Sequence, residues 1–356
     1  MAEPLKNLYN KHYIDLLCNE LLHVNKEQFR NKVFDELWEK RELKERMRHI
    51  SIILGKFLPS KYDEAIDILM KIFPKFPSNM GLENMIFQDF VEVYGLEHYE
   101  KSMKALECFT KQSSSEFAVR RFIIKYQNKS MNQMKIWANS DNLHVRRLAS
   151  EGCRPRLPWA IALPEFKKNP KKVIEILEIL KDDESEYVRR SVANNLNDIS
   201  KDNPDTVKNI TKDWIGENTN RDKLLKHGCR TLLKQSDEDI LKLFGFKNKK
   251  DISVRDFCIT KKVLQNGNLD FSFVVMSKEN IGKIRIEYAL EFLRQNNKYS
   301  KKIFKISEST CSKNFKKVKK SYSFKPISTR TYYNGLHKIQ IIINGEILHE
   351  DEFIYS

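Results

Sequence analysis

The chain has 356 residues, of which 40% are hydrophobic and 31% are charged, a composition typical of a globular protein with two or three domains. Its 64 Lys and Arg residues against 48 Asp and Glu residues give a formal charge of +16, which favours a polyanionic partner or an acidic membrane surface over a neutral metabolite. No apolar run approaches the roughly 18 residues of a membrane span, and the N-terminus lacks the apolar segment of a signal peptide, so we expect a cytoplasmic protein.

The first 110 residues carry amphipathic patterns typical of helices. The longest pattern runs over residues 29–58, and Pro59, Pro74 and Pro77 interrupt the pattern that follows it. We therefore expect this region to be helical, with breaks at the prolines.

A phrase with a Val-Arg-Arg core recurs in the middle of the chain. Its copies are EFAVRRFIIKY (116–126), LHVRRLASEGC (143–153), EYVRRSVANNL (186–196) and the degenerate RDKLLKHGCRTLLK (221–234). Aligned on their first arginine, or on Lys226 in the last copy, they are separated by 26, 43 and 37 residues, near the unit length of HEAT-like helical pairs. Residues 169–183 and 203–215 are predicted to form the outer helices of these pairs. The sequence therefore predicts an α-solenoid.

Beyond about residue 250, apolar and polar residues alternate. The alternating segments are FSFVVMSK (271–278), KIRIEYALEFL (283–293), YSFKPI (322–327) and HKIQIIINGEIL (337–348), with Asn-Gly turns at 266–267, 334–335 and 344–345. This pattern predicts a small β-sandwich, joined to the helices by a linker at residues 244–254. The expected fold class is multidomain α + β, with a helical domain over residues 1–250 and a β-sandwich over residues 251–356.

The segment VRRLASEGCRPRLPW, residues 145–159, brings an acid and a large aromatic close to a basic surface. Its helix is predicted to end at Gly152, because Pro155 and Pro158 follow. Trp159 then lies on a constrained loop, a few residues after Glu151.

The Val-Arg-Arg repeats resemble those of a known family when they are taken with three further phrases. These phrases are SEGCRPRLPW (150–159), ANNLNDISKDNP (193–204) and HGCRTLLK (227–234). Together they resemble the AlkC branch of the HEAT-like-repeat DNA glycosylases, relatives of AlkD, over about residues 1–245. The β tail resembles the immunoglobulin-like domain that part of that branch carries. The resemblance implies excision of cationic N-alkylated bases, particularly 3-methylcytosine and 3-methyladenine, from double-stranded DNA in base excision repair.

Three acids are candidates for that chemistry. A base methylated at a ring nitrogen leaves as a neutral group, so the catalytic burden falls on the sugar, which develops oxocarbenium character. Carboxylates near the sugar can stabilise this charge and orient a water. Glu116, Glu151 and Asp198 each belong to a Val-Arg-Arg repeat, the resemblance points to the same positions, and we expect Asp198 to position the water.

Each candidate also has a structural interpretation. Glu116 could be a helix-start acid, Glu151 could pair with Arg147 at i,i+4 spacing, and Asp198 could be a helix-end acid. Trp159 could pack against its loop, but we expect it to bind substrate by stacking on a cationic base.

The arginines of the repeats are predicted to hold DNA phosphates along one face. The expected DNA-binding residues are Arg120, Arg147, Arg154, Arg156, Arg190, Lys226 and Arg230. Arg-Arg pairs in solenoids also reach acids of the next repeat, so we expect only about half of them to contact DNA. The lysine run at 313–320 is either a solvated loop or face, or a second grip on the duplex.

Other chemistries find no support in the sequence. It lacks G-x-G-x-x-G, G-x-x-x-x-G-K-[ST] and G-x-S-x-G motifs, its histidines form no H-x-x-x-H pair, and its six cysteines form no CxxC. We therefore expect no cofactor and no metal. We also expect a monofunctional glycosylase that acts as a monomer. The alternative is a noncatalytic solenoid that binds nucleic acid or a partner protein, with the acids serving as salt bridges between repeats.

Overall fold

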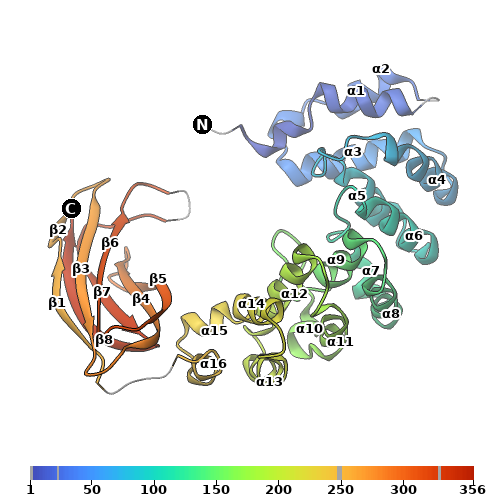
Figure 1. The fold of residues 1–356 in the computed structure, drawn as a ribbon. Helices are drawn as coiled ribbons and strands as arrows, with labels where there is room; N and C mark the ends of the chain where they lie inside the picture. The colour runs from blue at the N-terminus through green and yellow to red at the C-terminus, as the bar shows by residue number, and fades with distance from the viewer. Residues whose placement is uncertain (1–2, 22–23, 247–250, 328–329) are drawn as a thin grey trace. The chain divides into compact units, whose positions relative to one another are not determined.

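The computed structural model describes residues 3–21, 24–246, 251–327 and 330–356, and the chain forms two compact units (Figure 1). The first unit holds the residues up to 207 together with 216–228, and the second holds 208–215 and the residues from 229 onward. Helices α15 (Arg230–Lys234) and α16 (Glu238–Leu243) belong with the strands in this division, and the domain boundary at residue 250 stays a prediction. Leu241 of α16 packs against the turn at Gly345, where it leaves no room for a Cβ atom.

Helices make up the first unit and end with α14. They are α1 (Lys11–Glu20), α2 (Lys26–Val33), α3 (Leu43–Phe57), α4 (Tyr62–Ile72), α5 (Met85–Tyr94), α6 (Tyr99–Thr110), α7 (Val119–Lys125), α8 (Gln127–Ala138), α9 (Leu143–Gly152), α10 (Pro164–Lys168), α11 (Lys171–Leu180), α12 (Glu186–Ile199), α13 (Pro204–Trp214), which both units share, and α14 (Thr219–Gly228). In the described part of the chain, none of the helices combines the length and apolar character needed to cross a bilayer.

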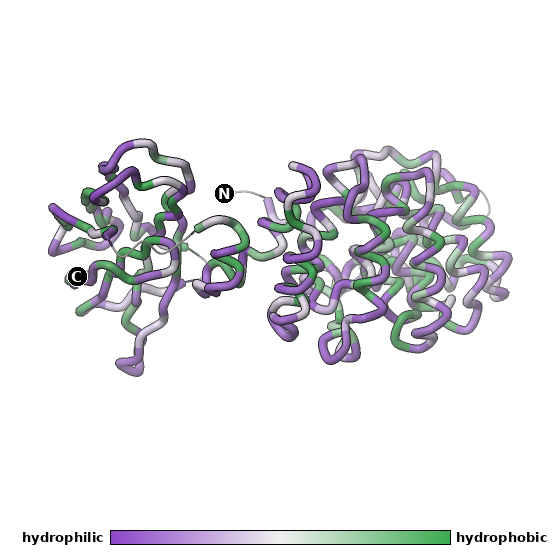
Figure 2. The backbone as a smooth tube through the Cα atoms, turned by 60° about the horizontal axis from the view of Figure 1, so that its bottom comes forward, coloured by the Kyte–Doolittle hydropathy of each residue, from purple (hydrophilic) through white to green (hydrophobic). Residues whose placement is uncertain are grey.

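The helices stack in two rows, which confirms the predicted solenoid. In one row α9 packs on α12 and α12 packs on α14, and in the other α8 packs on α11. The first three copies of the repeat phrase lie on α7, α9 and α12, and the degenerate fourth copy spans α14 and α15. Each helix buries an apolar stripe, such as Val173, Ile176, Leu177 and Leu180 of α11, and the stripes show as recurring green along the tube in Figure 2.

The long pattern over residues 29–58 forms two helices instead of one. The chain leaves α2 after Val33, and a short 3-10 helix at Trp38–Lys40 separates it from α3. Glu42 and Glu45 then form a reciprocal capping box that starts α3. Phe34 and Trp38 continue the apolar spacing through this break. Their rings pack edge to face, with 5.0 Å between the ring centroids.

The second unit contains two packed sheets, which confirms the predicted β-sandwich. Its strands are β1 (Ser253–Ile259), β2 (Lys262–Val263), β3 (Asn268–Met276), β4 (Gly282–Leu293), β5 (Tyr299–Cys311), β6 (Phe315–Ser323), β7 (Gly335–Ile343) and β8 (Glu346–Tyr355). The sheet orders are β1-β3-β6 and β2-β8-β7-β4-β5. The Asn344-Gly345 turn joins β7 to β8 with φ of 50° and 89°, the positive values that favour Asn-Gly in tight hairpins.

The structure makes two expectations of this unit more specific. The lysine run at 313–320 is mostly the edge strand β6, whose lysines are largely exposed while Val318 is buried in the core, so it forms a solvated face and not a loop. The segment 322–327 continues as a strand only to Ser323. In the expected linker, Phe244 and Phe246 are buried, and residues 247–250 lie outside the described residues.

Gly152 allows α7, α8 and α9 to pack closely, and we expect Gly152→Ala to destabilise the helical unit. A Cβ atom at Gly152 would lie 2.8 Å from Val119 Cγ1 and 3.4 Å from Met134 Cε. Overpacking of this kind typically lowers the free energy of unfolding by about 1–3 kcal/mol. Urea unfolding followed by far-UV circular dichroism measures it. Gly81→Ala is the control, because its nearest neighbour would lie at 3.6 Å, and equal stability of the two variants would contradict the packing argument.

Candidate active site

The segment after α9 forms a hydrogen-bonded loop, residues 153–163, which we call the site loop. The Leu163 amide donates to the Pro155 carbonyl at 3.1 Å, and the Ala160 amide donates to the Leu157 carbonyl at 3.3 Å. Pro164 then begins α10. These bonds fold the site loop back on itself beside the end of α9.

Two carboxylates from successive repeats meet at one arginine of the site loop. Arg154 donates through Nε to Asp198 at 2.8 Å and through Nη1 to Glu151 at 2.6 Å. These side chains are buried, with Asp198 1% and Arg154 8% exposed. Ser191 on α12 donates its hydroxyl to the second oxygen of Glu151. Residues more than forty positions apart are thus held in one cluster.

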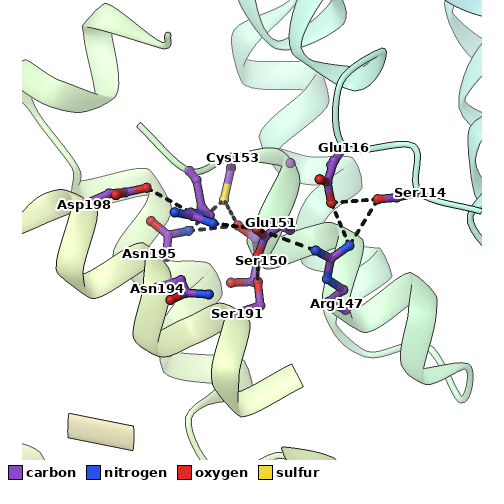
Figure 3. A network of polar contacts seen from close by, with 12 residues as sticks. Ser114, Glu116, Arg147, Ser150, Glu151, Cys153, Ser191, Asn194, Asn195 and Asp198 are labelled. Atoms are coloured by element: carbon purple, nitrogen blue, oxygen red, sulfur yellow. Dashed lines mark hydrogen bonds and ion pairs between the residues drawn. The ribbon is translucent and has the colours of Figure 1, made fainter. Parts of the chain in front are cut away.

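The third candidate acid joins this cluster through a second arginine. Arg147 on α9 donates to Glu116 at 2.6 Å and lies 3.6 Å from Glu151 (Figure 3). Ser114 donates its hydroxyl to the same Glu116 oxygen at 2.7 Å. We call Glu116, Arg147, Glu151, Arg154 and Asp198 the carboxylate network. The structure therefore brings together all three acids that the sequence singled out.

The acids and arginines of the carboxylate network alternate, so each buried charge has an opposite neighbour. Burial lowers the pKa of Arg154, but Glu151 and Asp198 outweigh this effect and leave the pKa raised. The pKa of Arg147 is raised in the same way, because Glu116 and Glu151 outweigh burial. Both arginines are therefore fixed cations that hold the carboxylates in place.

One oxygen of Asp198 differs from the rest of the network in its partner. Arg154 bonds to Oδ2, whereas Oδ1 accepts from Lys201 Nζ at 3.1 Å. The Lys201 side chain is 39% exposed and belongs to the turn after α12. A flexible ammonium can be displaced at low cost, and Asp198 then offers a carboxylate oxygen to another cation or to a water.

Trp159 lies outside the carboxylate network, on the site loop. Its backbone has a φ of 64°, in the left-handed region that residues with a Cβ atom rarely adopt. The residue is 65% exposed, so the loop presents the ring to solvent and does not pack it. The Trp159 carbonyl accepts from Lys44 Nζ on α3 at 2.8 Å.

The first arginine of each Val-Arg-Arg phrase bonds to main-chain carbonyls. Arg146 donates to Ser140 and Asp141, each at 3.0 Å, and Arg189 donates to the equivalent carbonyls of Asp183 and Glu184. Each thereby closes the turn before its own helix. Arg120 departs from this pattern: it is fully buried and bonds to carbonyls at both ends of the site loop.

Most of the arginines expected to bind phosphate are committed to other partners. Arg120 and Arg154 are buried, and Arg147 is only 17% exposed and pairs with Glu116, which removes all three from an open DNA-binding face in this structure. Arg156 is partly exposed and pairs with Asp202 through two bonds of 2.6 and 2.7 Å. Arginine-rich repeats serve here first to join helices, as the structural interpretation proposed.

Arg190 on α12 is exposed, and among the described residues no ion pair or hydrogen bond holds its side chain. It lines a cavity of about 340 Å³ between α12 and α14, together with Arg189, Lys223 and His227. Lys226 lies on α14, partly buried, and Arg230 begins α15 in the second unit.

Sequence reasoning missed four residues of these sites. Lys201 follows Asp198 by three positions, and Ser191 precedes it by seven, so helical spacing could have placed them near it. Lys223 lies one turn before Lys226 and could have been found in the same way. Tyr187 stacks under Arg147 at 5.0 Å, but no spacing rule indicates this contact between repeats.

The second unit carries a basic edge. Residues 299–320 contain eight lysines and one acid, Glu308. They form β5 and β6, the outermost strands of the two sheets, joined by a short corner at residues 312–314. We call the lysines of these strands the lysine edge, and its charge suits a polyanion.

Comparisons with known proteins cover both units. The family model of the DNA alkylation repair enzyme matches residues 17–232, and that of the C-terminal Ig-like domain of the uncharacterised protein YhaZ matches residues 253–355. The chain is 44% identical over 349 residues to the uncharacterized protein YhaZ of Bacillus subtilis (strain 168), covering 96% of this chain and 97% of that protein. It matches the structure of Pseudomonas fluorescens alkylpurine DNA glycosylase AlkC bound to DNA containing an abasic site analog, with a TM-score of 0.94, 29% identity, and coverage of 99% and 100%. These matches confirm the family resemblance that the repeats indicated.

The two arginines of the site loop allow a matched test of the carboxylate network. Arg154→Met leaves two buried carboxylates without their shared cation, and such a loss typically costs about 3–5 kcal/mol. Arg156→Met breaks a partly exposed pair with Asp202, which is worth only about 0–1 kcal/mol. Urea unfolding of both variants measures the difference. Equal stabilities would show that Arg154 does not hold the network together.

Proposed function

Because this chain belongs to the DNA alkylation repair enzyme family, we propose that it is a monofunctional DNA glycosylase that acts as a monomer on double-stranded DNA. Its substrates are cationic N-alkylated bases, foremost 3-methylcytosine and 3-methyladenine, and it removes them in the first step of base excision repair. The likeness to an alkylpurine DNA glycosylase over nearly the whole chain supports the reaction class.

The observation that carries the proposal is the carboxylate network. Asp198 and Glu151 converge on Arg154, and among the described residues only the partly exposed Lys201 covers the second oxygen of Asp198. A site that already holds an ammonium on a carboxylate is prepared for a developing positive charge. In the reaction this charge belongs to the sugar, and it takes the place of Lys201 beside Asp198.

Hydrolysis then needs no general acid. The C1′–N bond breaks with its electron pair going to the alkylated base, which leaves neutral. Asp198 orients a water toward C1′, the water oxygen bonds to C1′, and its proton passes to the carboxylate. Glu151 and Glu116 stabilise the oxocarbenium-like sugar through their negative charge. Trp159 stacks on the cationic base, which increases its population beside the acids.

Basic residues outside the network bind the DNA backbone. Arg190, Lys223 and Lys226 on α12 and α14 are the foremost contacts of the helical unit, and the lysine edge is the contact of the β-sandwich. Arg156 and Arg230 are further candidates. Arg120, Arg147 and Arg154 act within the fold instead, because Arg120 and Arg154 are buried and Arg147 is mostly covered and paired with Glu116.

A noncatalytic solenoid would also use acids as salt bridges between repeats, and excision assays separate the two functions. We expect the wild type to release free base from duplex DNA carrying 3-methylcytosine or 3-methyladenine. Asp198→Asn and Glu151→Gln should lower the single-turnover rate by about a hundredfold or more, because each removes negative charge beside the reacting sugar. Chromatography of the released base measures the rate.

The control for these variants is Glu165→Gln, which changes an exposed acid paired with Lys168 and should keep the wild-type rate. Circular dichroism checks that each variant is folded. A folded wild type that releases no base, or acid variants as fast as the wild type, would favour the noncatalytic scaffold.

The lysine edge has its own test. The double variant Lys317→Gln/Lys319→Gln should weaken binding to undamaged duplex DNA and reduce the slope of log K against log salt by about 0.9 per lost phosphate contact. Lys261→Gln/Lys262→Gln changes the same number of lysines at β2, the opposite edge of the five-stranded sheet. Fluorescence anisotropy titrations at several salt concentrations measure both. Identical slopes for the two variants would argue against DNA contact at the lysine edge.

A further inference from the structure

The backbone conformation of Trp159 must be stabilised by contacts with other residues. A left-handed conformation is unfavourable for a residue with a Cβ atom, and the exposed ring gains little from packing. The other tryptophans, Trp38, Trp137 and Trp214, are 5% exposed or less. The site loop therefore presents the Trp159 ring to solvent, and contacts from other residues must fix the conformation of this loop.

Arg120 bonds to both ends of the site loop from the buried side. Its guanidinium donates to Gly152 O at 3.0 Å, to Arg154 O at 2.8 Å and to Ile161 O at 2.6 Å. Burial lowers the pKa of Arg120 to about 10, so it stays a cation at neutral pH. Charged donors in a rigid planar fork make strong bonds to carbonyls and fix their relative positions. One side chain thus sets the spacing between the start and the end of the loop.

Lys44 bonds to the tip of the same loop from a distant helix. Its Nζ on α3 donates to the Trp159 carbonyl at 2.8 Å and lies 5.1 Å from the centroid of the Phe117 ring. Phe117 follows Glu116 in the chain, so this ammonium connects the loop tip with the segment that carries the third acid of the network.

We propose that Arg120 and Lys44 are positioning residues for base excision, which hold the site loop in the conformation that presents Trp159 and fixes Arg154 between Glu151 and Asp198. The contrast with the other repeats supports this assignment. Arg146 and Arg189 occupy the equivalent position of their phrases and close the turn before their own helix, and Arg146 also pairs with the Asp183 carboxylate. Arg120 instead bonds to three main-chain carbonyls at the two ends of the site loop. The expected effect on base excision rests on the proposed function, but the claim that Arg120 and Lys44 fix the loop conformation does not.

Hydrogen exchange measured by mass spectrometry tests the hold directly. In Lys44→Met and Arg120→Lys we expect the amides of residues 157–163 to exchange at least tenfold faster than in the wild type, while those of α12 are unchanged. Arg120→Lys keeps the charge but cannot span three carbonyls. The controls are Lys56→Met, an exposed lysine on α3, and Arg121→Lys, the exposed neighbour of Arg120. If Arg120→Lys does not fold, Lys44→Met decides the question. Unchanged exchange in the loop overturns the proposal, whatever the activity.

Single-turnover excision of 3-methylcytosine tests the positioning role. We expect Lys44→Met to excise at least tenfold more slowly, since small displacements of catalytic groups have effects of this size or larger. Its affinity for undamaged duplex and its salt dependence should stay at the wild-type values, because Lys44 acts through the loop. A loosened loop with a wild-type rate would overturn the positioning role. A wild type that releases no base would instead refute the proposed function, while the exchange result would still decide whether the loop is held.

Discussion

One buried guanidinium, that of Arg154, holds the candidate site together. It joins Glu151 at the end of α9 to Asp198 near the end of α12, so two repeats share one cation. Burying three charges is costly unless each has a partner, and the geometry in which all are satisfied is narrow. The arrangement therefore fixes carboxylates within a solvent-poor region, where their charge acts more strongly than it would in water. The solenoid supplies the rigid helices that such a narrow geometry requires.

The repeat phrase has two structural tasks in addition to any binding. Its first arginine closes the turn before the helix in two copies, and its second reaches an acid of the preceding repeat, as Arg147 does with Glu116 and Arg121 does with Glu92. Arg190 is the second arginine of the third copy, and among the described residues it lacks such an acid. Among the described residues, the repeat thus leaves the exposed guanidinium of Arg190 without an acidic partner, whereas Arg121 and Arg147 are paired with acids.

Local patterns predicted the architecture well because helices and strands follow from short-range periodicity. The α-solenoid, the β-sandwich and the Asn344-Gly345 turn were all visible in the sequence. The break before α3 was not, since apolar spacing runs through Phe34 and Trp38 as if the helix continued. The strand β6 was missed for a related reason: an edge strand tolerates lysines on its open side, and within the lysine run Val318 alone is buried in the core.

The acids of the site could be predicted from the sequence, but the partners of its arginines could not. Glu116, Glu151 and Asp198 could be proposed because equivalent positions of stacked repeats lie side by side. The partner of an arginine depends instead on the distance between two repeats and on burial, which a sequence does not state. Arg120 shows the consequence, because the phrase makes it equivalent to Arg146 while its guanidinium crosses to the site loop. A residue whose contacts differ from those of the equivalent residues in other repeats is therefore the better guide to a specialised role. Here the contacts of Arg120 lead to the site loop, which carries Trp159.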